Sequence, residues 1–249
     1  MRRASAVIAV VALMATGVSH AGEIVVSAAA SLTNAFKDIA QAYEAQHAGS
    51  KVSLNFGASG ALLQQMAKGA PVDVFASADQ ETMDQAVKQN LVQARDRQDF
   101  VRNSLVLIVP ADGKPAIGKL GDLTQAEVKR IAIGNPASVP VGRYTRQALE
   151  TARLWRAVEP KMIGTQNVRQ SLDYVARGEV DAGFVYMTDA ALMKDKVRVA
   201  FDVPLDTEIR YPIAKAANSA NAAEASRFIA FVLSPPSQAI LGKYGFRKP

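Results

Sequence analysis

Apolar and polar positions along the first hundred residues follow two periods. Short runs that are apolar or that alternate are typical of strands. Between them apolar residues recur every three or four positions, as at Leu32, Phe36 and Ile39, and this period predicts helices. Strand, helix, strand, helix, strand is typical of an α/β sheet with parallel strands. The expected strands cover 23–27, 51–56 and 72–76, and helices are expected from about 32, from about 62 and over 79–89.

A longer apolar strand is predicted over 103–110, and a long return strand over 208–217. Between them lies a second α/β series. Two such series joined by two long strands predict a two-lobed α/β fold, with each lobe a mainly parallel sheet flanked by helices. Ligands of such sheets lie at the carboxyl ends of the strands, which here means the cleft between the lobes. The second series is expected to hold strands at 130–133, 182–186 and 197–201 and helices from about 142 and over 168–175; closing helices are expected at 222–233 and 236–244.

The first 21 residues form a predicted signal peptide. Arg2 and Arg3 precede the apolar run 6–18, and small residues at Ser19 and Ala21 suit a signal peptidase. The run is too short for a permanent membrane helix, which needs about 20 residues. We expect a mature chain that starts near residue 22 and is periplasmic. There is no cysteine to lipidate, which favours the free form. The expected domains are 1–21 (signal peptide), 22–103 with 208–249 (lobe 1) and 104–207 (lobe 2).

Composition excludes several kinds of site. With no cysteine, and only His47 left after the signal peptide is removed, zinc and copper sites of the usual kind are implausible. His47 lies at the polar end of a helix pattern, and we expect it at the surface. Without Arg2 and Arg3, 27 basic residues stand against 23 acidic ones, a mild and scattered net charge of +4. A nucleic-acid partner would need a basic face with aromatic neighbours, so none is expected.

Several expected strand-to-helix junctions share small residues, hydroxyl groups and amides at helix starts. Individually, Ser31, Ser59 and Asn167 could be ordinary helix caps, and Tyr186 a core aromatic. Jointly they favour an anion site, because helix-start amides and neutral hydroxyls can hold a fully deprotonated oxyanion without any charged side chain. The junctions are 28–31, 57–60, 135–142, 166–168 and Tyr186.

Charged residues near these junctions are the main argument against a neutral site. Arg143 and Arg169 each follow a junction closely, and we expect both side chains to point toward solvent. A protonated oxyanion such as hydrogen phosphate would need an acceptor for its own proton. Asp73 and Asp189 are near enough to the junctions to be considered as that acceptor, but neither lies in a junction loop.

Six segments together resemble the periplasmic molybdate-binding proteins of ABC transporters, over almost the whole chain from about 23 to 246. This resemblance implies a type II periplasmic binding fold with one oxyanion between two lobes. The segments are AAASLTNAFKDIA, GAPVDVFASADQETMDQA, GNPASVPVGRYTRQAL, QNVRQSL, GFVYMTDA and KYGF.

Matching the family's motifs position by position implies five ligand-binding residues. Lobe 1 would supply the hydroxyls of Ser31 and Ser59. Lobe 2 would supply the backbone amides of Val141 and Val168 and the hydroxyl of Tyr186. The molybdenum would be held through its oxygens, without direct coordination by protein. Where some relatives carry Ala, this chain has Val141, a change that matters little to a backbone contact.

These expectations describe a non-enzymatic solute-binding protein that captures molybdate, and tungstate as a dianion of nearly the same size. No cofactor and no catalytic residue are expected, and the partner would be an inner-membrane ABC permease, with the binding protein a monomer. A binding protein for sulfate, thiosulfate, phosphate or a small carboxylate is the first alternative, and a cleft-facing Arg143 or Arg169 would favour it. A secreted serine hydrolase using Ser59 is remote, because GASGA lacks the G-x-S-x-G spacing.

Overall fold

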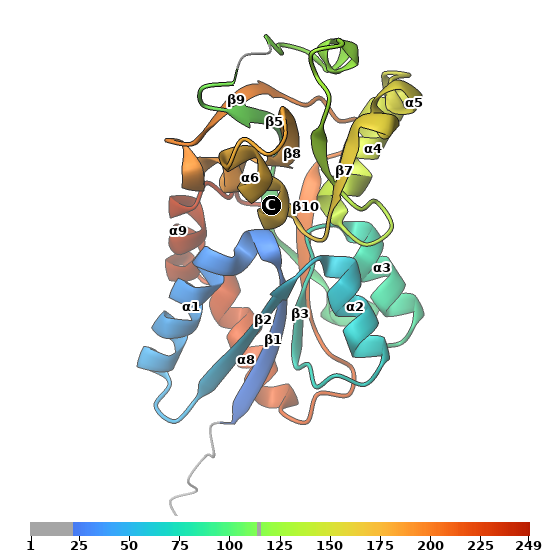
Figure 1. The fold of residues 1–249 in the computed structure, drawn as a ribbon. Coiled ribbons are helices and arrows are strands. Elements are labelled where there is room, and N and C mark those ends of the chain that lie inside the picture. The colour runs from blue at the N-terminus through green and yellow to red at the C-terminus, as the bar shows by residue number, and fades with distance from the viewer. Residues whose placement is uncertain (1–21, 114–115) are drawn as a thin grey trace, which may run out of the picture.

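A computed structural model describes residues 22–113 and 116–249, and the predicted signal peptide lies outside the described residues. Two five-stranded sheets, each flanked by helices, form two lobes stacked one above the other (Figure 1). The two-lobed α/β fold expected from the sequence is therefore confirmed. In the described part of the chain, no helix is both long enough and apolar enough to cross a membrane.

Lobe 1 is built on a sheet with the strand order β2-β1-β3-β10-β4. Strand β1 pairs in parallel with β2 and β3, whereas β10 runs antiparallel to both β3 and β4. The strands are β1 (Glu23–Ala29), β2 (Lys51–Gly57), β3 (Val74–Ala76), β4 (Gln98–Asn103) and β10 (Ile209–Lys215).

Lobe 2 is built on a sheet with the strand order β7-β6-β8-β5-β9. Here β6 pairs in parallel with β7 and β8, and β5 runs antiparallel to β8 and β9. The strands are β5 (Leu105–Pro110), β6 (Ile131–Gly134), β7 (Met162–Thr165), β8 (Ala182–Tyr186) and β9 (Val197–Asp202).

Both sheets are mixed rather than mainly parallel, which corrects one detail of the expectation. The antiparallel pairings all involve β10 or β5, the strands next to the two crossings between the lobes. A strand that enters a sheet directly from the other lobe, without a crossover helix, is free to run against its neighbours. The single strand expected over 103–110 is two strands, because the chain leaves the lobe 1 sheet after Asn103 and enters the lobe 2 sheet at Leu105.

The helices cover the sheets with their apolar faces. In α1 the buried positions are Ala35, Phe36, Ile39, Ala40 and Tyr43, the helical period seen in the sequence. The two closing helices α8 and α9 pack against α1, so the end of the chain completes lobe 1 (Figure 1). The α-helices are α1 (Thr33–Gln46), α2 (Ser59–Ala67), α3 (Gln80–Lys88), α4 (Pro140–Thr151), α5 (Trp155–Val158), α6 (Val168–Ala176), α7 (Met187–Ala190), α8 (Ala222–Leu233) and α9 (Pro235–Lys243).

Candidate functional site

The strand-to-helix junctions of both lobes meet at one small cavity. It contains about 210 Å³ of empty space between the lobes, part of which is open to solvent. The five residues matched from the sequence all line it, two from lobe 1 and three from lobe 2. None of the described residues that line it has a charged side chain. The lining consists of Ala29, Ala30, Ser31, Gly57, Ala58, Ser59, Ala78, Val139, Pro140, Val141, Asn167, Val168 and Tyr186.

The two serine hydroxyls of lobe 1 are buried, and neither caps its own helix. Ser31 lies in a 3-10 turn, Ala30–Leu32, between β1 and α1, and its Oγ is 2.9 Å from the hydroxyl of Tyr211. Ser59 is the first residue of α2, and its Oγ accepts a hydrogen bond of 3.0 Å from the backbone N–H of Ala78. Each hydroxyl therefore has one protein partner and retains hydrogen-bonding capacity toward the cavity.

The Tyr186 hydroxyl comes from lobe 2, at the end of β8. The side chain is buried, and in the described structure its hydroxyl has no hydrogen-bond partner. Burial raises the pKa of Tyr186 well above that of a free tyrosine, so the group stays protonated and able to donate. A buried, unpartnered hydroxyl is costly, by about 1–3 kcal/mol, unless a bound group satisfies it. Its position on the cavity wall fits a ligand that accepts a hydrogen bond.

Two helix starts of lobe 2 add backbone amides. Pro140 opens α4 and Val141 follows it, while Val168 is the first residue of α6. The first amides of a helix have no acceptor within the helix, and they carry its positive dipole end. At Val139 no side chain caps α4, and the Asn167 side chain caps α6 through the amide of Gln170 instead. The amides of Val141 and Val168 are thus left for the cavity.

Arg143 lies outside the cavity, but its side chain does not point to solvent as expected. Its Nε and Nη2 lie 2.8 and 2.7 Å from Oδ2 of Asp79, which is in lobe 1. A further hydrogen bond of 2.6 Å reaches the hydroxyl of Thr82. The expectation was wrong because Asp79, the N-cap of α3, offers a buried carboxylate directly across the cleft.

Arg169 makes a second connection between the lobes, and for it too the expected solvent orientation was wrong. Its Nε lies 2.5 Å from Oδ1 of Asp189 in lobe 2. The same guanidinium donates to Oδ1 of Asn34 at 2.9 Å and to the carbonyl oxygen of Ser31 at 3.1 Å, both in lobe 1. Both arginines are therefore engaged by protein groups at the edge of the cavity.

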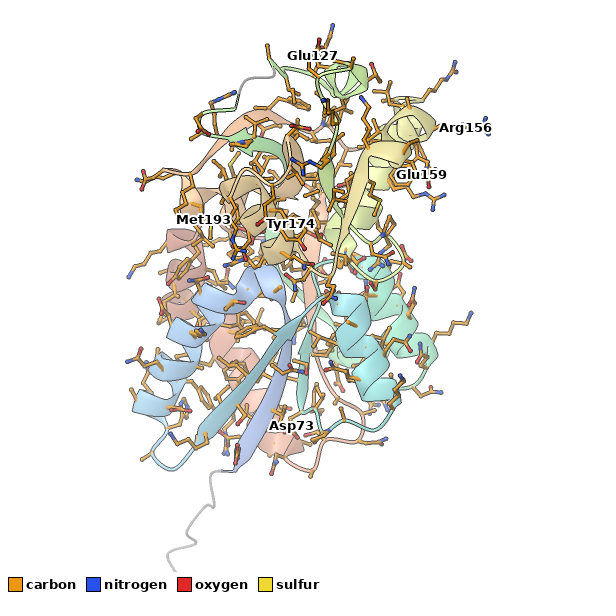
Figure 2. All side chains as sticks on the ribbon, in the orientation of Figure 1. Asp73, Glu127, Arg156, Glu159, Tyr174 and Met193 are labelled. Atoms are coloured by element: carbon orange, nitrogen blue, oxygen red, sulfur yellow. The ribbon has the colours of Figure 1, made fainter. Side chains whose placement is uncertain are left out.

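The two aspartates considered as proton acceptors do not line the cavity. Figure 2 shows Asp73 at the end of lobe 1 remote from lobe 2, where it accepts hydrogen bonds from the amide of Val25 and the hydroxyl of Ser219. Asp189 is fully buried beside Arg169, and burial raises its pKa to about 6, partly offset by the guanidinium. Neither carboxylate is placed to accept a proton from a bound anion.

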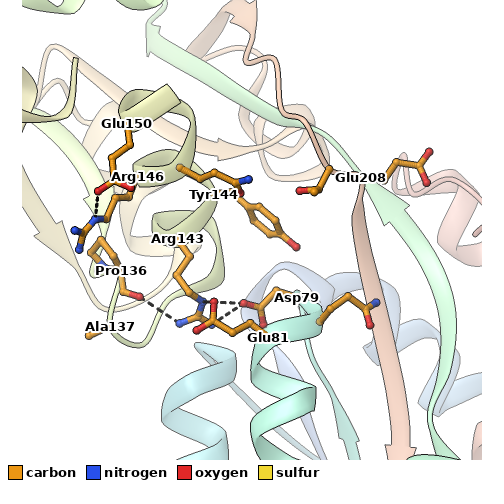
Figure 3. A pocket seen from close by; sticks show the side chains of 12 residues that line it. Asp79, Glu81, Pro136, Ala137, Arg143, Tyr144, Arg146, Glu150 and Glu208 are labelled. Carbon is orange, nitrogen blue, oxygen red and sulfur yellow. Dashed lines mark hydrogen bonds and ion pairs between the residues drawn. The ribbon is translucent and has the colours of Figure 1, made fainter. Parts of the chain in front are cut away.

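A larger and more polar cleft lies next to the cavity, on the outer side of Arg143 (Figure 3). It contains about 1200 Å³ of empty space and is open to solvent. Charged groups of both signs line it, including Arg143 with Asp79 and the exposed pair of Arg146 with Glu150. Among the described residues, four carboxylates line the cleft against two guanidinium groups, so its larger size does not make it the better anion site.

Two further contacts between the lobes were not foreseen from the sequence. The amide of Gly60 donates to the carbonyl oxygen of Ser138 at 3.0 Å, across the cleft. The side-chain amide of Asn103, in lobe 1, donates to the hydroxyl of Thr188 in lobe 2, and it also reaches Tyr211 within its own lobe. Pairs separated by more than 70 residues leave no local signal in a single sequence. They hold the two lobes closed over the cavity.

Metal-site chemistry is absent from the described residues, where no three His, Cys, Asp or Glu side chains gather in a way that could hold a metal ion. His47, expected at the surface, is half-buried, because its ring stacks on Tyr43 with the ring centroids 4.1 Å apart. This histidine lies at the end of α1, among residues of lobe 1 away from the cavity lining.

The comparisons with known proteins agree with this architecture. The family model for bacterial extracellular solute-binding proteins matches residues 24–247. The chain belongs to this family. Its members are transport proteins that bind a solute, so the chain is a binding protein and not an enzyme. What such a protein binds is a ligand and not a resident cofactor.

Two relatives and one solved structure illustrate the similarity. The molybdate-binding protein ModA of Escherichia coli is 34% identical over 241 residues, 94% of this chain and 93% of the relative. YvgL of Bacillus subtilis, by its name an ABC transporter substrate-binding lipoprotein, is 36% identical over 225 residues, 90% and 85% of the two chains. The periplasmic molybdate-binding protein of Azotobacter vinelandii superposes with a TM-score of 0.78, covering 91% and 99% of the chains; at 23% identity it supports the fold alone.

Proposed function

We propose that this solute-binding protein captures molybdate, and also tungstate, in the small cavity between its lobes and delivers the anion to an ABC permease in the inner membrane. The observation that carries the proposal is the composition of the cavity. It brings three hydroxyls and two free helix-start amides to one space without a charged side chain, and one of these hydroxyls, Tyr186, is buried without a partner. The ligand-binding residues we propose are Ser31, Ser59, Val141, Val168 and Tyr186.

Neutral donors suit an oxyanion that carries no proton. Such an anion accepts hydrogen bonds on every oxygen, and hydroxyls and helix-start amides supply donors. A carboxylate ligand would be better served by an arginine fork, yet Arg143 and Arg169 are held by Asp79 and Asp189. The similarity to molybdate-binding relatives favours molybdate among the unprotonated oxyanions. Selectivity over sulfate, which has the same charge, would then come from the size of the cavity.

The division of donors between two lobes supports a capture mechanism. An anion that contacts both lobes at once binds the closed state more tightly than the open state, and so shifts the population toward closure. The closed protein, as a periplasmic monomer, would dock on the permease. We place the lobe boundaries at 103/104 and 207/208, where the chain passes from one sheet to the other.

Sulfate, thiosulfate or phosphate is the alternative ligand. Calorimetric titration of the mature chain with molybdate, tungstate, sulfate and phosphate, side by side, separates these possibilities. We expect micromolar or tighter binding of molybdate and tungstate and much weaker binding of the other two. Bound anion should also raise the melting temperature, because it stabilises only the folded state. Tight binding of sulfate or phosphate, without molybdate binding, would overturn the proposal.

The first site variant to test is Ser59→Ala. It removes a hydroxyl that faces the cavity and leaves the amide of Ala78 without its acceptor. We expect molybdate binding to weaken by about 1–3 kcal/mol, roughly 5- to 150-fold. Ser53→Ala is the matched control, because that hydroxyl bonds Glu23 on the exposed side of β2. An unchanged affinity in Ser59→Ala would remove this residue from the site.

A further inference from the structure

Two side chains connect the crossing between the lobes to the Ser31 hydroxyl. Asn103 is the last residue of β4, where the chain leaves the lobe 1 sheet. Its Nδ2 lies 3.2 Å from the hydroxyl of Tyr211, which belongs to β10 and is fully buried. The Tyr211 hydroxyl in turn lies 2.9 Å from Oγ of Ser31, on the cavity wall. Tyr211 and Asn103 do not themselves line the cavity.

The orientation of the Asn103 amide is determined by its backbone neighbour. Its Oδ1 accepts a hydrogen bond of 2.9 Å from the N–H of Ser104. In the flipped amide, the NH2 group would face this N–H, and two donors cannot form a hydrogen bond. The Nδ2 group therefore faces Tyr211, and also the Thr188 hydroxyl at 2.9 Å. Because an amide nitrogen can only donate, the Tyr211 oxygen must accept.

The direction of the next hydrogen bond follows. Tyr211 has a single hydroxyl proton, and Ser31 Oγ is the remaining partner of its hydroxyl in the described structure. Tyr211 therefore donates to Ser31. Burial raises the pKa of Tyr211 well above its usual value, so this proton is retained. Since Ser31 Oγ accepts from Tyr211, its own proton is free to point into the cavity.

From this geometry we infer that Tyr211 and Asn103 are positioning residues that hold Ser31 as a hydrogen-bond donor toward the bound anion. Ser59 is held in the same sense, because its oxygen accepts the N–H of Ala78. Tyr186 has no other recipient for its proton. All three hydroxyls thus present protons to the cavity. This inference rests on the proposed function and sharpens it: the site selects a fully deprotonated oxyanion and rejects one that must itself donate, such as hydrogen phosphate.

We call the donation from Tyr211 to Ser31, which orients the Ser31 proton toward the cavity, the relay. A double-mutant cycle of Tyr211→Phe and Ser31→Ala tests it. Phenylalanine keeps the ring that packs edge-on against Phe100, Tyr186 and Phe246, and removes only the hydroxyl. In the wild-type background we expect the molybdate dissociation constant to rise about threefold to tenfold. In the Ser31→Ala background the same change should have less than a twofold effect, because the proton it orients is gone. Tyr211→Phe should also narrow the preference for molybdate over phosphate, since Ser31 can then accept.

Tyr43→Phe is the matched control, because it removes another buried tyrosine hydroxyl of lobe 1, one that donates to Glu224 away from the cavity. We expect this variant to lower the melting temperature and to leave anion affinity unchanged. If Tyr211→Phe weakens binding equally in both backgrounds, its role is structural and the relay is wrong, while the proposed function stands. If the wild-type protein binds phosphate in preference to molybdate and sulfate, the relay and the proposed function both fail.

Discussion

The cavity and the charged cleft beside it differ in a way that explains the site. The cavity is small and lined by neutral groups, whereas the cleft is several times larger and carries both arginine and carboxylate side chains. Arg143 lies at the boundary between them and is turned toward Asp79 (Figure 3). Positive charge is thus present within a few residues of the helix starts that we propose to bind the anion, yet these guanidinium groups are paired with carboxylates and connect the lobes. The comparison teaches that the character of the proposed anion site depends on its neighbours as well as on its lining. The cavity stays neutral because nearby guanidinium groups are held by carboxylates outside it.

The largest effect should come from preventing the lobes from closing. A Cβ on Gly60 would lie 2.6 Å from the carbonyl oxygen and 2.9 Å from the Cα of Ser138, both backbone atoms of the opposite lobe. In Gly60→Ala the open protein has no such conflict, so its melting temperature without anion should be unchanged. Molybdate affinity should fall at least about 100-fold, because the closed state is blocked. Titration calorimetry and thermal unfolding measure the two quantities.

The control for that variant is Gly121→Ala, where an added Cβ meets no atom within 4 Å. It should bind molybdate as the wild type does. Gly60→Ala with wild-type affinity would mean that the anion-bound state does not need this close approach, and the neutral cavity would then not be assembled by closure.

A second, intermediate effect concerns the buried carboxylate on the Arg169 side of the cavity. The pKa of Asp189 is raised to about 6 in the folded protein from its ordinary value of 3.8, with burial as the main cause. The folded state therefore binds the proton more readily than the unfolded state, so this group stabilises the fold most below about pH 4. The contribution falls as pH rises through 6 and is then constant.

Asp189→Asn removes that titration and keeps the shape of the side chain. The free energy of unfolding of the wild type, measured relative to this variant by urea denaturation, should fall by about 1–3 kcal/mol between pH 4 and pH 7. A difference that does not change with pH would show that Asp189 is ionised throughout the range, and that the Arg169 guanidinium outweighs its burial.

The smallest effect is expected from removing the charge next to the cavity. Arg143→Met breaks the ion pair with Asp79 across the cleft but touches no cavity-lining hydroxyl, so molybdate should bind about threefold to tenfold more weakly. Arg146→Met is the matched control one turn along α4, because its pair with Glu150 is half exposed and lies within one lobe. It should change affinity by less than twofold. A loss far above tenfold in Arg143→Met, with a steep dependence on salt, would place the guanidinium on the anion.

The sequence predicts the secondary structure well where periodicity is strong. The strand Ala182–Tyr186 and the helix Ala222–Leu233 were expected at those bounds, since one is a continuous apolar run and the other a regular amphipathic pattern. The strands β4 and β7 were missed. In β4 (QDFVRN) polar residues outnumber apolar ones, and β7 (MIGT) is a short edge strand that leaves three of its four residues at least partly accessible, so neither shows a strand pattern.

The residues that line the site were predictable from the sequence, but the residues that hold them in place were not. Junction residues such as Ser31 and Val168 stand next to recognisable strand ends and helix starts, and the structure brings all five predicted residues to one cavity. Tyr211 and Asp79 could not be assigned, because their partners lie far along the chain and on other elements. The directions in which Arg143 and Arg169 turn, at the fourth and second positions of their helices, depend on groups in the opposite lobe, and the pattern of a single helix contains nothing about that lobe.

The place of β10 in the lobe 1 sheet bears on the order in which the protein folds. This strand lies between β3 and β4, although the whole of the lobe 2 sheet comes between β4 and β10 in the chain. Strand pairings between distant parts of the chain form slowly, because the entropy cost of closing the loop comes before any stabilising contact is made. We therefore expect the lobe 2 sheet, whose strands are contiguous in the chain, to form early. The lobe 1 sheet would be completed only when β10 pairs with β3 and β4. Since that strand carries Tyr211, a newly folding molecule would become able to bind the solute fully only at the final stage of folding.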